Sequence, residues 1–318
     1  MDSKTIQSYA NKIKENIESV LVGKSDTVDL VLTSLFAGGH VLLEDVPGTG
    51  KTMLAKTLAK SLDTKFARIQ FTPDLLPSDI TGLHYFNQKM GEFQFRQGPV
   101  FTNILLADEI NRATPRTQSS MLECMEEKQV TVDGETTPLR SPFFVIATQN
   151  PIETAGTFPL PEAQLDRFMM QVSLGFPTEE EEIMIMNRFL QDNPYNQIHP
   201  VCPENIILDI HESLKEVFIH PIVMEYIAKL VATTRTAPEV ALGVSPRGTL
   251  ALIHALRSYA AIKGLSYVTP DMVKVLAVPV LAHRLVLHNN FHRRENTTEV
   301  MNKILNSTPV PTEDFKNK

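Results

Sequence analysis

Apolar residues at helical spacing open the chain. Five of them lie three or four positions apart: Ile6, Ala10, Ile13, Ile17 and Leu21. The spacing puts all five on one side of a helix, so we predict an amphipathic helix over Ser3–Leu21. A second helix is predicted over Asp26–Phe36, where the pattern ends at the glycine pair Gly38 and Gly39.

Short, continuous apolar runs follow and predict strands. The four runs are His40–Leu43, Lys65–Phe71, Asn103–Ala107 and Pro142–Thr148. The last two are apolar enough to be buried on both faces, and Leu54, Leu58 and Leu62 share one side of a predicted helix between the first two runs. Buried strands that alternate with helices are typical of a parallel sheet flanked by helices on both sides, an α/β fold.

Two polar segments interrupt this alternation. Residues 72–98 have glycines at 82, 91 and 98 and no sustained period, which predicts an inserted loop or a short hairpin. Residues 130–136 alternate around Asp133-Gly134, a strong hairpin signal, so we predict a hairpin over residues 128–141.

The pattern changes again at residues 175–178. Thr178 can cap a helix that begins with four glutamates, which the positive end of a helix stabilises. Helical patterns continue at Glu179–Leu190, Pro221–Thr234, Pro246–Lys263 and Pro270–Leu287. We therefore predict a core domain over residues 1–175 and a smaller, all-helical domain over residues 176–318.

Composition and charge narrow the class of protein. The 318 residues are enough for about two domains of roughly 100–200 residues, with the apolar content of a globular chain. A net charge of −7 supplies no general attraction for nucleic acid. Cys124 and Cys202 are the only cysteines and have no ligand set around them, which argues against a disulfide framework or a structural zinc site.

Nothing in the sequence indicates export or membrane insertion. The longest apolar run, Val275–Ala282, is far shorter than the roughly 20 residues that a spanning helix needs. The start of the chain lacks the basic flank and apolar stretch of a signal peptide. We expect a cytoplasmic protein without a membrane span.

A glycine-rich turn lies between the first predicted strand and the next helix. Residues 46–52 are VPGTGKT, and the glycines let the backbone amides and the helix N-terminus approach phosphate oxygens closely. In such a loop Lys51 reaches the outer phosphates and the Thr52 hydroxyl ligates magnesium. The chain departs from the strict pattern at Asp45, where glycine is usual. Its place between strand and helix still predicts nucleotide binding.

Two acidic residues end the third predicted strand. Asp108 and Glu109 directly follow the apolar run at 103–107. A phosphate-loop protein needs a magnesium-facing carboxylate here, the role we predict for Asp108, and a base that polarises the attacking water, the role we predict for Glu109. The pair favours hydrolysis over storage of the nucleotide.

Three further polar residues complete the predicted catalytic set with Lys51 and Glu109. Asn150 directly follows the run at 142–148, so its amide can reach the terminal phosphate or the attacking water. Arg167 and Arg247 are candidate cations for the negative charge that develops on the transferred phosphoryl group.

Six segments, taken in order, resemble the AAA+ ATPases and, within them, the MoxR family. They are VPGTGKT at 46–52, GPVF at 98–101, LADEINRA at 106–113, ATQNP at 147–151, FPLPEAQLDRF at 158–168 and SPR at 245–247. The resemblance covers nearly the whole chain. It implies a P-loop NTPase core of the AAA+ type followed by a helical lid domain.

The resemblance also implies a role for each residue. Gly48 to Thr52 would be Walker A, Asp108 and Glu109 Walker B, Asn150 sensor 1, Arg247 sensor 2 and Arg167 the arginine finger. The residues that would bind ATP and Mg²⁺ are Val22, Gly23, Val46, Pro47, Gly48, Thr49, Gly50, Lys51, Thr52, Met53, Asp108 and Arg247, with Thr52 and Asp108 on the metal. Adenine is expected near Val22 and Gly23, and the lid is expected to place Arg247 over the nucleotide.

Partners follow from the same resemblance. An arginine finger acts on the nucleotide of the neighbouring subunit, so the family forms rings, typically hexamers. Its members resemble chaperones that couple ATP hydrolysis to the maturation of partner complexes or to metal insertion into them, often with a von Willebrand A domain protein. Residues 72–98 and 130–137 would face the ring pore or a protein client.

Two other functions stay open. A nucleic-acid-dependent ring motor would grip DNA with the same hairpins, but a gripping tip needs Lys or Arg, whereas this tip is Asp133-Gly134-Glu135. A nucleotide-gated scaffold would bind ATP without turnover, although every expected catalytic group is present. The identity of the client cannot be inferred from the sequence.

Overall fold

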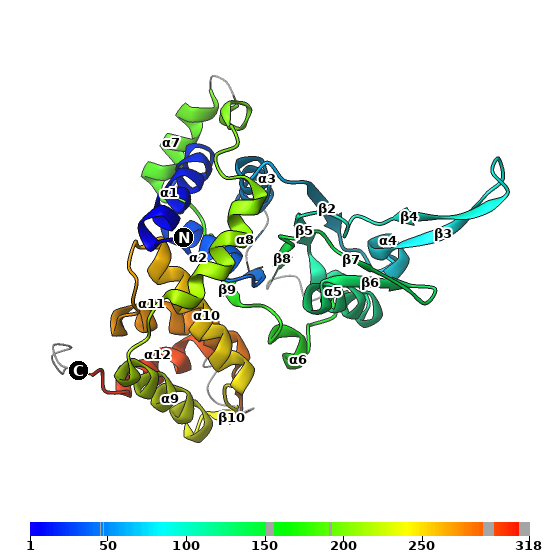
Figure 1. Ribbon diagram of the computed structural model, residues 1–318. Coiled ribbons are helices and arrows are strands. Elements are labelled where there is room, and N and C mark those ends of the chain that lie inside the picture. The colour runs from blue at the N-terminus through cyan, green and yellow to red at the C-terminus, as the bar shows by residue number, and fades with distance from the viewer. Residues whose placement is uncertain (45, 47, 151–155, 191–192, 289–295, 312–318) are drawn as a thin grey trace.

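A five-stranded parallel sheet forms the centre of the strand-rich half (Figure 1). The computed structural model describes residues 1–44, 46, 48–150, 156–190, 193–288 and 296–311. In spatial order the strands are β2 (Phe66–Gln70), β5 (Ile104–Asp108), β8 (Phe144–Gln149), β1 (Val41–Glu44) and β9 (Met170–Val172). Every pairing in this sheet is parallel, which confirms the predicted α/β fold. Only β9, three residues long, is not predicted by the apolar pattern.

Both faces of the central strands β1, β5 and β8 are buried. In β5, Ile104 and Leu106 belong to one apolar cluster, and the alternate residues Leu105 and Ala107 belong to another. The first cluster includes residues of α1 (Ser3–Val20), α2 (Ser25–Phe36) and α3 (Lys51–Ser61), and the second includes residues of α5 (Pro115–Glu127). Because helices cover both sides, the strand is apolar from Ile104 to Ala107 instead of alternating with polar residues.

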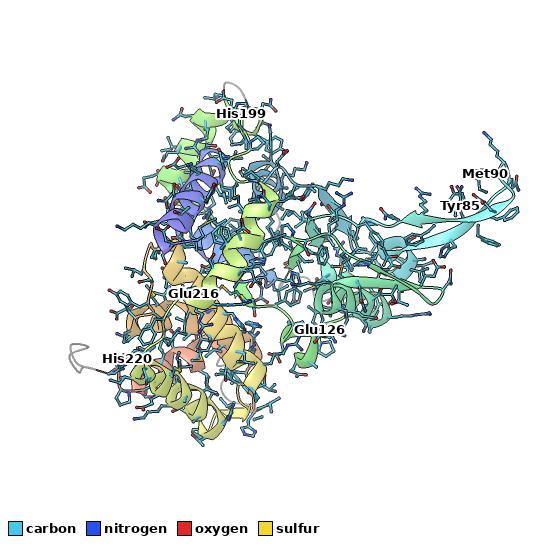
Figure 2. All side chains as sticks on the ribbon, viewed as in Figure 1. Tyr85, Met90, Glu126, His199, Glu216 and His220 are labelled. Atoms are coloured by element: carbon cyan, nitrogen blue, oxygen red, sulfur yellow. The ribbon has the colours of Figure 1, made fainter. Side chains whose placement is uncertain are left out.

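Two antiparallel hairpins occupy the segments that interrupt the α/β alternation. Their strands are β3 (Gly82–Asn87) with β4 (Glu92–Gln97), preceded by the short helix α4 (Pro77–Thr81), and β6 (Gln129–Val132) with β7 (Glu135–Pro138). The first hairpin projects away from the rest of the molecule, with Tyr85 and Met90 near its far end (Figure 2). His84 Nδ1 lies 2.9 Å from Asp133 Oδ2, so this contact ties the two hairpins together.

The second half of the chain is mainly helical. Its helices are α6 (Glu162–Leu165), α7 (Glu179–Phe189), α8 (Glu204–Ser213), α9 (Pro221–Thr236), α10 (Pro246–Ile262), α11 (Pro270–Leu281) and α12 (Thr297–Ser307). Beyond residue 175 the pattern predicts four of these and misses α8 and α12, each of which buries only two or three side chains. It also extends α11 too far, since the chain turns after Leu281 into a short 3₁₀ segment.

A small ladder departs from the all-helical expectation for residues 176–318. β10 (Val240–Leu242) and β11 (Val286–Leu287) pair in antiparallel orientation. Their side chains are mostly exposed or half-buried, so no apolar run marks them in the sequence. The ladder brings the segment after α11 beside the segment after α9.

The helical half packs directly on the first helices of the chain. The Ser258 hydroxyl of α10 donates to the Thr33 carbonyl oxygen of α2 at 2.8 Å, and Lys263 contacts the buried carboxylate of Asp29 at 2.7 Å. One continuous apolar cluster contains residues of α1, α2, α10 and α11. The division at residue 175 therefore marks a change in sequence pattern, and as a domain boundary it stays a prediction.

Candidate nucleotide site

The glycine-rich loop joins the end of β1 to the start of α3. Gly48 and Gly50 have φ angles of +89° and +93°, a region that glycine adopts without strain. Gly50 directly precedes α3, so the free amides of the first helical turn lie at the loop. Lys51 Nζ donates to the Val46 carbonyl oxygen at 3.2 Å, which holds the ammonium group over the loop.

A cleft of about 400 Å³ gathers polar groups around this loop. It is lined by Gly48, Gly50, Lys51, Thr52, Met53, Arg68, Gln70, Asp108, Glu109 and Asn150. The carboxyl ends of neighbouring parallel strands meet at one edge of a sheet, which is why residues from β2, β5 and β8 converge here. The structure thus brings together the predicted loop, both acidic residues and Asn150. Pro47, and Asp45 at the divergent position, lie outside the described residues.

Thr148, at the end of β8, organises the acidic pair. Its hydroxyl donates to Asp108 Oδ1 at 2.7 Å, and the Glu109 amide donates to the Thr148 hydroxyl oxygen at 2.8 Å. Glu109 has φ +57°, a left-handed conformation that costs a non-glycine residue of order 1–3 kcal/mol. The hydrogen bond from its amide helps to hold Glu109 in that conformation.

Two residues of β2 enter the cleft without having been predicted. Arg68 Nη2 lies 2.6 Å from Asp108 Oδ2, and Gln70 Nε2 donates to Glu109 Oε2 at 2.7 Å. Each acidic residue is therefore bonded to β2 as well as to Thr148. The signal that could have found them is the alternation of β2, where Arg68 and Gln70 share one face and pair in register with the end of β5.

A second pocket, of about 310 Å³, adjoins the loop on its other side. It is lined by Val20, Leu21, Val22, Lys24, Gly48, Thr49, Gly50, Met53, Phe176, Pro177, Glu182, Ile185 and Phe189. Its largely apolar walls suit a flat aromatic base, and they come from the start of the chain and from α7. The pocket lies where the adenine site is expected, near Val22 and Gly23, and adenine binding there stays a prediction.

Gly23 shows how closely the two walls approach. Its φ is +70°, and a Cβ at this position would lie 1.8 Å from a carboxylate oxygen of Glu181 in α7. Lys24 Nζ lies 3.8 Å from the same carboxylate group. The positive φ favours glycine where the chain passes α7, since the Glu181 side chain can move but the backbone conformation cannot be adopted without strain by other residues.

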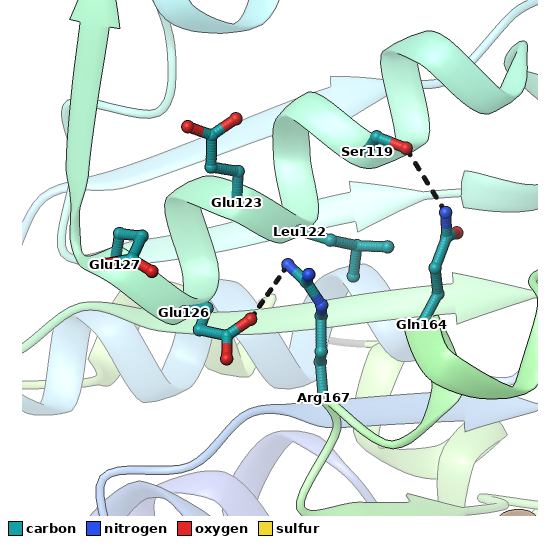
Figure 3. Close-up of a pocket in the computed structure, with 7 residues that line it drawn as sticks. All are labelled: Ser119, Leu122, Glu123, Glu126, Glu127, Gln164 and Arg167. Atoms are coloured by element: carbon teal, nitrogen blue, oxygen red, sulfur yellow. Dashed lines mark hydrogen bonds and ion pairs between the residues drawn. The ribbon is translucent and has the colours of Figure 1, made fainter.

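Arg167 and Arg247 lie together, away from the nucleotide cleft. Glu126, near the end of α5, accepts from both: its Oε2 is 3.1 Å from Arg167 Nη1, and its Oε1 is 2.9 Å from Arg247 Nη2. Figure 3 shows the Arg167 side of this arrangement. Neither arginine is among the residues that line the cleft or the base pocket.

Arg247 does not line this chain's own cleft, and the expectation that the lid places it over the nucleotide stays a prediction. Ser245, the N-cap of α10, donates to Asp166 at 3.2 Å, so α10 begins beside the segment that carries Arg167. That contact is between residues 79 positions apart in the sequence, and no local pattern predicts it.

Comparisons with known proteins agree with this architecture. Residues 40–170 match the family described as "ATPase family associated with various cellular activities (AAA)", and residues 232–304 match the AAA lid domain. The uncharacterized protein YeaC of Bacillus subtilis is 47% identical over 94% of each chain. Chaperone MoxR1 of Mycobacterium tuberculosis is 41% identical over 93% of this chain and 80% of its own. The chain belongs to the MoxR family of AAA ATPases.

A solved structure extends the likeness to three dimensions. The crystal structure of a candidate ATPase from Cytophaga hutchinsonii superposes with a TM-score of 0.90, at 38% identity and over 97% of both chains. This confirms the MoxR assignment and the AAA fold that the sequence motifs imply. Within the described residues, no helix is both long enough and apolar enough to span a membrane.

The cleft of this MoxR-family chain offers oxygen ligands that fit magnesium. The Thr52 hydroxyl and the Asp108 carboxylate both line it, and hard oxygen ligands are those that Mg²⁺ prefers. Over the described ranges, no group of three or more His, Cys, Asp or Glu side chains could hold a metal.

Proposed function

We propose that this chain binds ATP with Mg²⁺ and hydrolyses it as one subunit of a ring, typically a hexamer. The observation that carries the proposal is the separation of the predicted catalytic set. The cleft holds Lys51, Glu109 and Asn150, whereas Arg167 and Arg247 share Glu126 at another place on the molecule. A second copy that presents its arginine pair to the cleft would complete the site.

Binding of the nucleotide rests on the loop and the two pockets. The loop amides and Lys51 would hold the phosphates, with the ammonium group exchanging the Val46 carbonyl oxygen for phosphate oxygens. Thr52 and Asp108 would hold Mg²⁺, which when bound neutralises phosphate charge and orients the outer phosphates. The apolar pocket next to Val22 and Met53 would take the adenine.

Hydrolysis requires a positioned water molecule, which Glu109 would polarise as the base. Thr148 holds the Glu109 backbone, and Asn150 lies in the same cleft, where its amide can orient the water or the terminal phosphate. Gln70 occupies one carboxylate oxygen of Glu109, so this contact must loosen before that oxygen can accept from water.

The arginines would act on the neighbour. Arg167 and Arg247 are about a third to a half exposed and within reach of one carboxylate, so two cations are presented side by side. Removing an arginine that stabilises the transferred phosphoryl group costs on the order of 10³ in rate. We infer that both side chains leave Glu126 for the neighbouring subunit's nucleotide during turnover.

A chaperone-like role follows from the named relative, Chaperone MoxR1. The client would be a protein complex in the cytoplasm that the ring remodels or matures. The family resemblance implies that maturation can include metal insertion and that the partner can be a von Willebrand A domain protein. The projecting β3–β4 hairpin exposes Phe86 and Phe93 to 52% and 70%, which suits contact with a protein.

Nucleic acid fits this surface less well. The turn of the β6–β7 hairpin carries the 72%-exposed Asp133 side chain and the exposed Glu135, so its charge repels phosphate. We expect the ATPase rate at low salt to be the same with and without single- or double-stranded DNA. Stimulation by several-fold would favour the ring motor instead.

A mixing experiment tests the shared site. Arg167→Ala subunits keep their own cleft, and Lys51→Ala subunits keep their arginines, so neither hydrolyses ATP well by itself. Mixed rings would contain Arg167→Ala clefts facing intact arginines, and partial recovery of ATPase activity is expected. No recovery, with both variants folded and assembled, would contradict action on a neighbour. A Glu109→Gln variant that binds ATP and still turns it over would place the base elsewhere.

A further inference from the structure

We propose that Arg284 is a positioning residue for the arginine pair: it clamps the segment that carries Arg167 to the start of α10, which carries Arg247. The inference rests on the proposed function, in which those two arginines complete a neighbour's site. Arg284 itself touches neither the cleft nor either arginine's bond to Glu126, so its effect would be indirect.

The first observation is how Arg284 is buried. Its side chain is 3% exposed, and its Nε lies 2.7 Å from Asp166 Oδ1. Its guanidinium group also donates to the carbonyl oxygens of Phe168 at 2.9 Å and, more weakly, Asp166 at 3.3 Å. These bonds fix the backbone on both sides of Arg167.

The second observation is the other oxygen of the same carboxylate. Asp166 Oδ2 accepts from the Ser245 hydroxyl at 3.2 Å, and that hydroxyl also accepts from the Gly248 amide as the N-cap of α10. Arg247 lies two residues after Ser245. One carboxylate therefore joins Arg284, the Arg167 segment and the first turn of α10.

Packing around the clamp leaves little freedom. A Cβ added to Gly248 would lie 2.7 Å from the Arg284 Cδ atom, so the first turn of α10 rests directly on the arginine stem. Arg284 Nη1 also donates to the Val280 carbonyl oxygen of α11, which anchors the guanidinium group from the other side. Arg284 thus contacts both segments, beside the direct bond from Ser245 to Asp166.

The choice of arginine points to geometry more than to stability. Replacing a buried ion pair by apolar residues is often neutral for folding, so the pair is weak evidence of a stabilising role. A planar guanidinium group can bind a carboxylate and several carbonyl oxygens at once, which the single ammonium group of lysine cannot do. Arg284→Lys should therefore keep the charge and lose the clamp.

The experiment measures kcat and the dissociation constant for ATP in Arg284→Lys. We expect kcat to fall by about 10- to 100-fold, the effect of misplacing a catalytic group by about 1 Å, while the dissociation constant for ATP stays within about twofold. The matched control is Lys263→Met, which breaks the ion pair between the residue after α10 and Asp29 of α2 and should leave kcat unchanged. If Arg284→Lys fails to fold, the double variant Asp166→Leu/Arg284→Met replaces it. This variant should fold, because an apolar pair takes the place of the buried ion pair.

Mixing locates the defect. Arg284→Lys subunits mixed with Lys51→Ala subunits should recover activity, since the intact arginines of the second variant then face intact clefts. A wild-type kcat in Arg284→Lys, or in the folded double variant, would overturn the proposal. So would a lack of recovery on mixing when Arg167→Ala with Lys51→Ala does recover. If the mixture of Arg167→Ala with Lys51→Ala also shows no recovery, the result contradicts the shared site of the proposed function.

Discussion

The Thr148 hydroxyl donates to the Asp108 carboxylate at 2.7 Å, and its oxygen also accepts from the backbone amide of Glu109. A strand end thus holds both acidic residues of the cleft through one side chain. Thr148 follows a run of buried residues, and it is fully buried itself. Its role depends on β8 lying beside β5 in the sheet.

Thr148→Val should lower kcat with little change in the dissociation constant for ATP. Valine has the same shape but makes neither hydrogen bond, so the Glu109 amide loses its partner and the base loses its fixed position. We expect a loss of about tenfold or more in kcat and about 1–3 kcal/mol in the free energy of unfolding. Steady-state kinetics and urea denaturation measure the two effects. Thr148→Ser, which keeps the hydroxyl, should retain most of the activity.

Gln70→Ala should raise the ATPase rate of the assembled ring. The Gln70 amide donates to Glu109 Oε2 at 2.7 Å, and Arg112 Nε lies 3.3 Å from the same oxygen, so the attacking water competes with Gln70 for the base. An increase of about two- to tenfold in kcat corresponds to a hydrogen bond of about 0.5–1.5 kcal/mol. The exposed Gln97→Ala, on the distant hairpin, serves as the control. An unchanged or lower kcat would show that the bond does not restrain Glu109.

Glu126→Gln should make the ring active at a lower protein concentration. Glu126 holds both arginines at 3.1 and 2.9 Å, and this carboxylate competes with the neighbour's phosphates for them. Because these ion pairs are partly exposed, we expect the concentration for half-maximal activity to fall by only about two- to fivefold. Glu123→Gln removes the same charge from the same pocket wall and should have a smaller effect. A need for more protein would mean that Glu126 prepares the arginines instead of competing for them.

Acid should destabilise the fold through His40. The imidazole lies between β8 and α5, with Nδ1 accepting from the Val145 amide at 3.1 Å and Nε2 3.0 Å from the Met125 carbonyl oxygen. The neutral ring satisfies both contacts, and burial lowers the pKa of His40 from 6.5 to about 4. Below pH 6.5 the unfolded chain therefore binds a proton that the folded chain does not, so the free energy of unfolding falls as pH falls toward 4.

His40 alone is expected to contribute a slope of about 1.4 kcal/mol per pH unit, or about 2 kcal/mol lost at pH 5. Urea denaturation at pH 7, 6 and 5 measures it, and the slope should be shallower in His40→Gln. Burial also lowers the pKa of His283, to about 3, so part of the slope remains in that variant. An equal slope in wild type and His40→Gln would contradict the prediction.

The sequence by itself determined the α/β alternation, the phosphate loop and the acidic strand end. Each of these is local: a continuous apolar run predicts a doubly covered strand, and Asp108 and Glu109 directly follow one. The motifs that resemble the MoxR family added the expected roles of Asn150, Arg167 and Arg247. The pattern missed the helices α8 and α12, and it missed β10–β11 because its strands are two or three residues long.

Only the tertiary structure decided where the cations lie. Arg68 reaches Asp108 because β2 pairs with β5, and Arg247 reaches Glu126 because Asp166 and Arg284 hold the start of α10 beside the Arg167 segment. These contacts join residues 40 to 121 positions apart. Sequence spacing sets which side chains share a strand or a helix face. Packing between distant elements sets which charges meet.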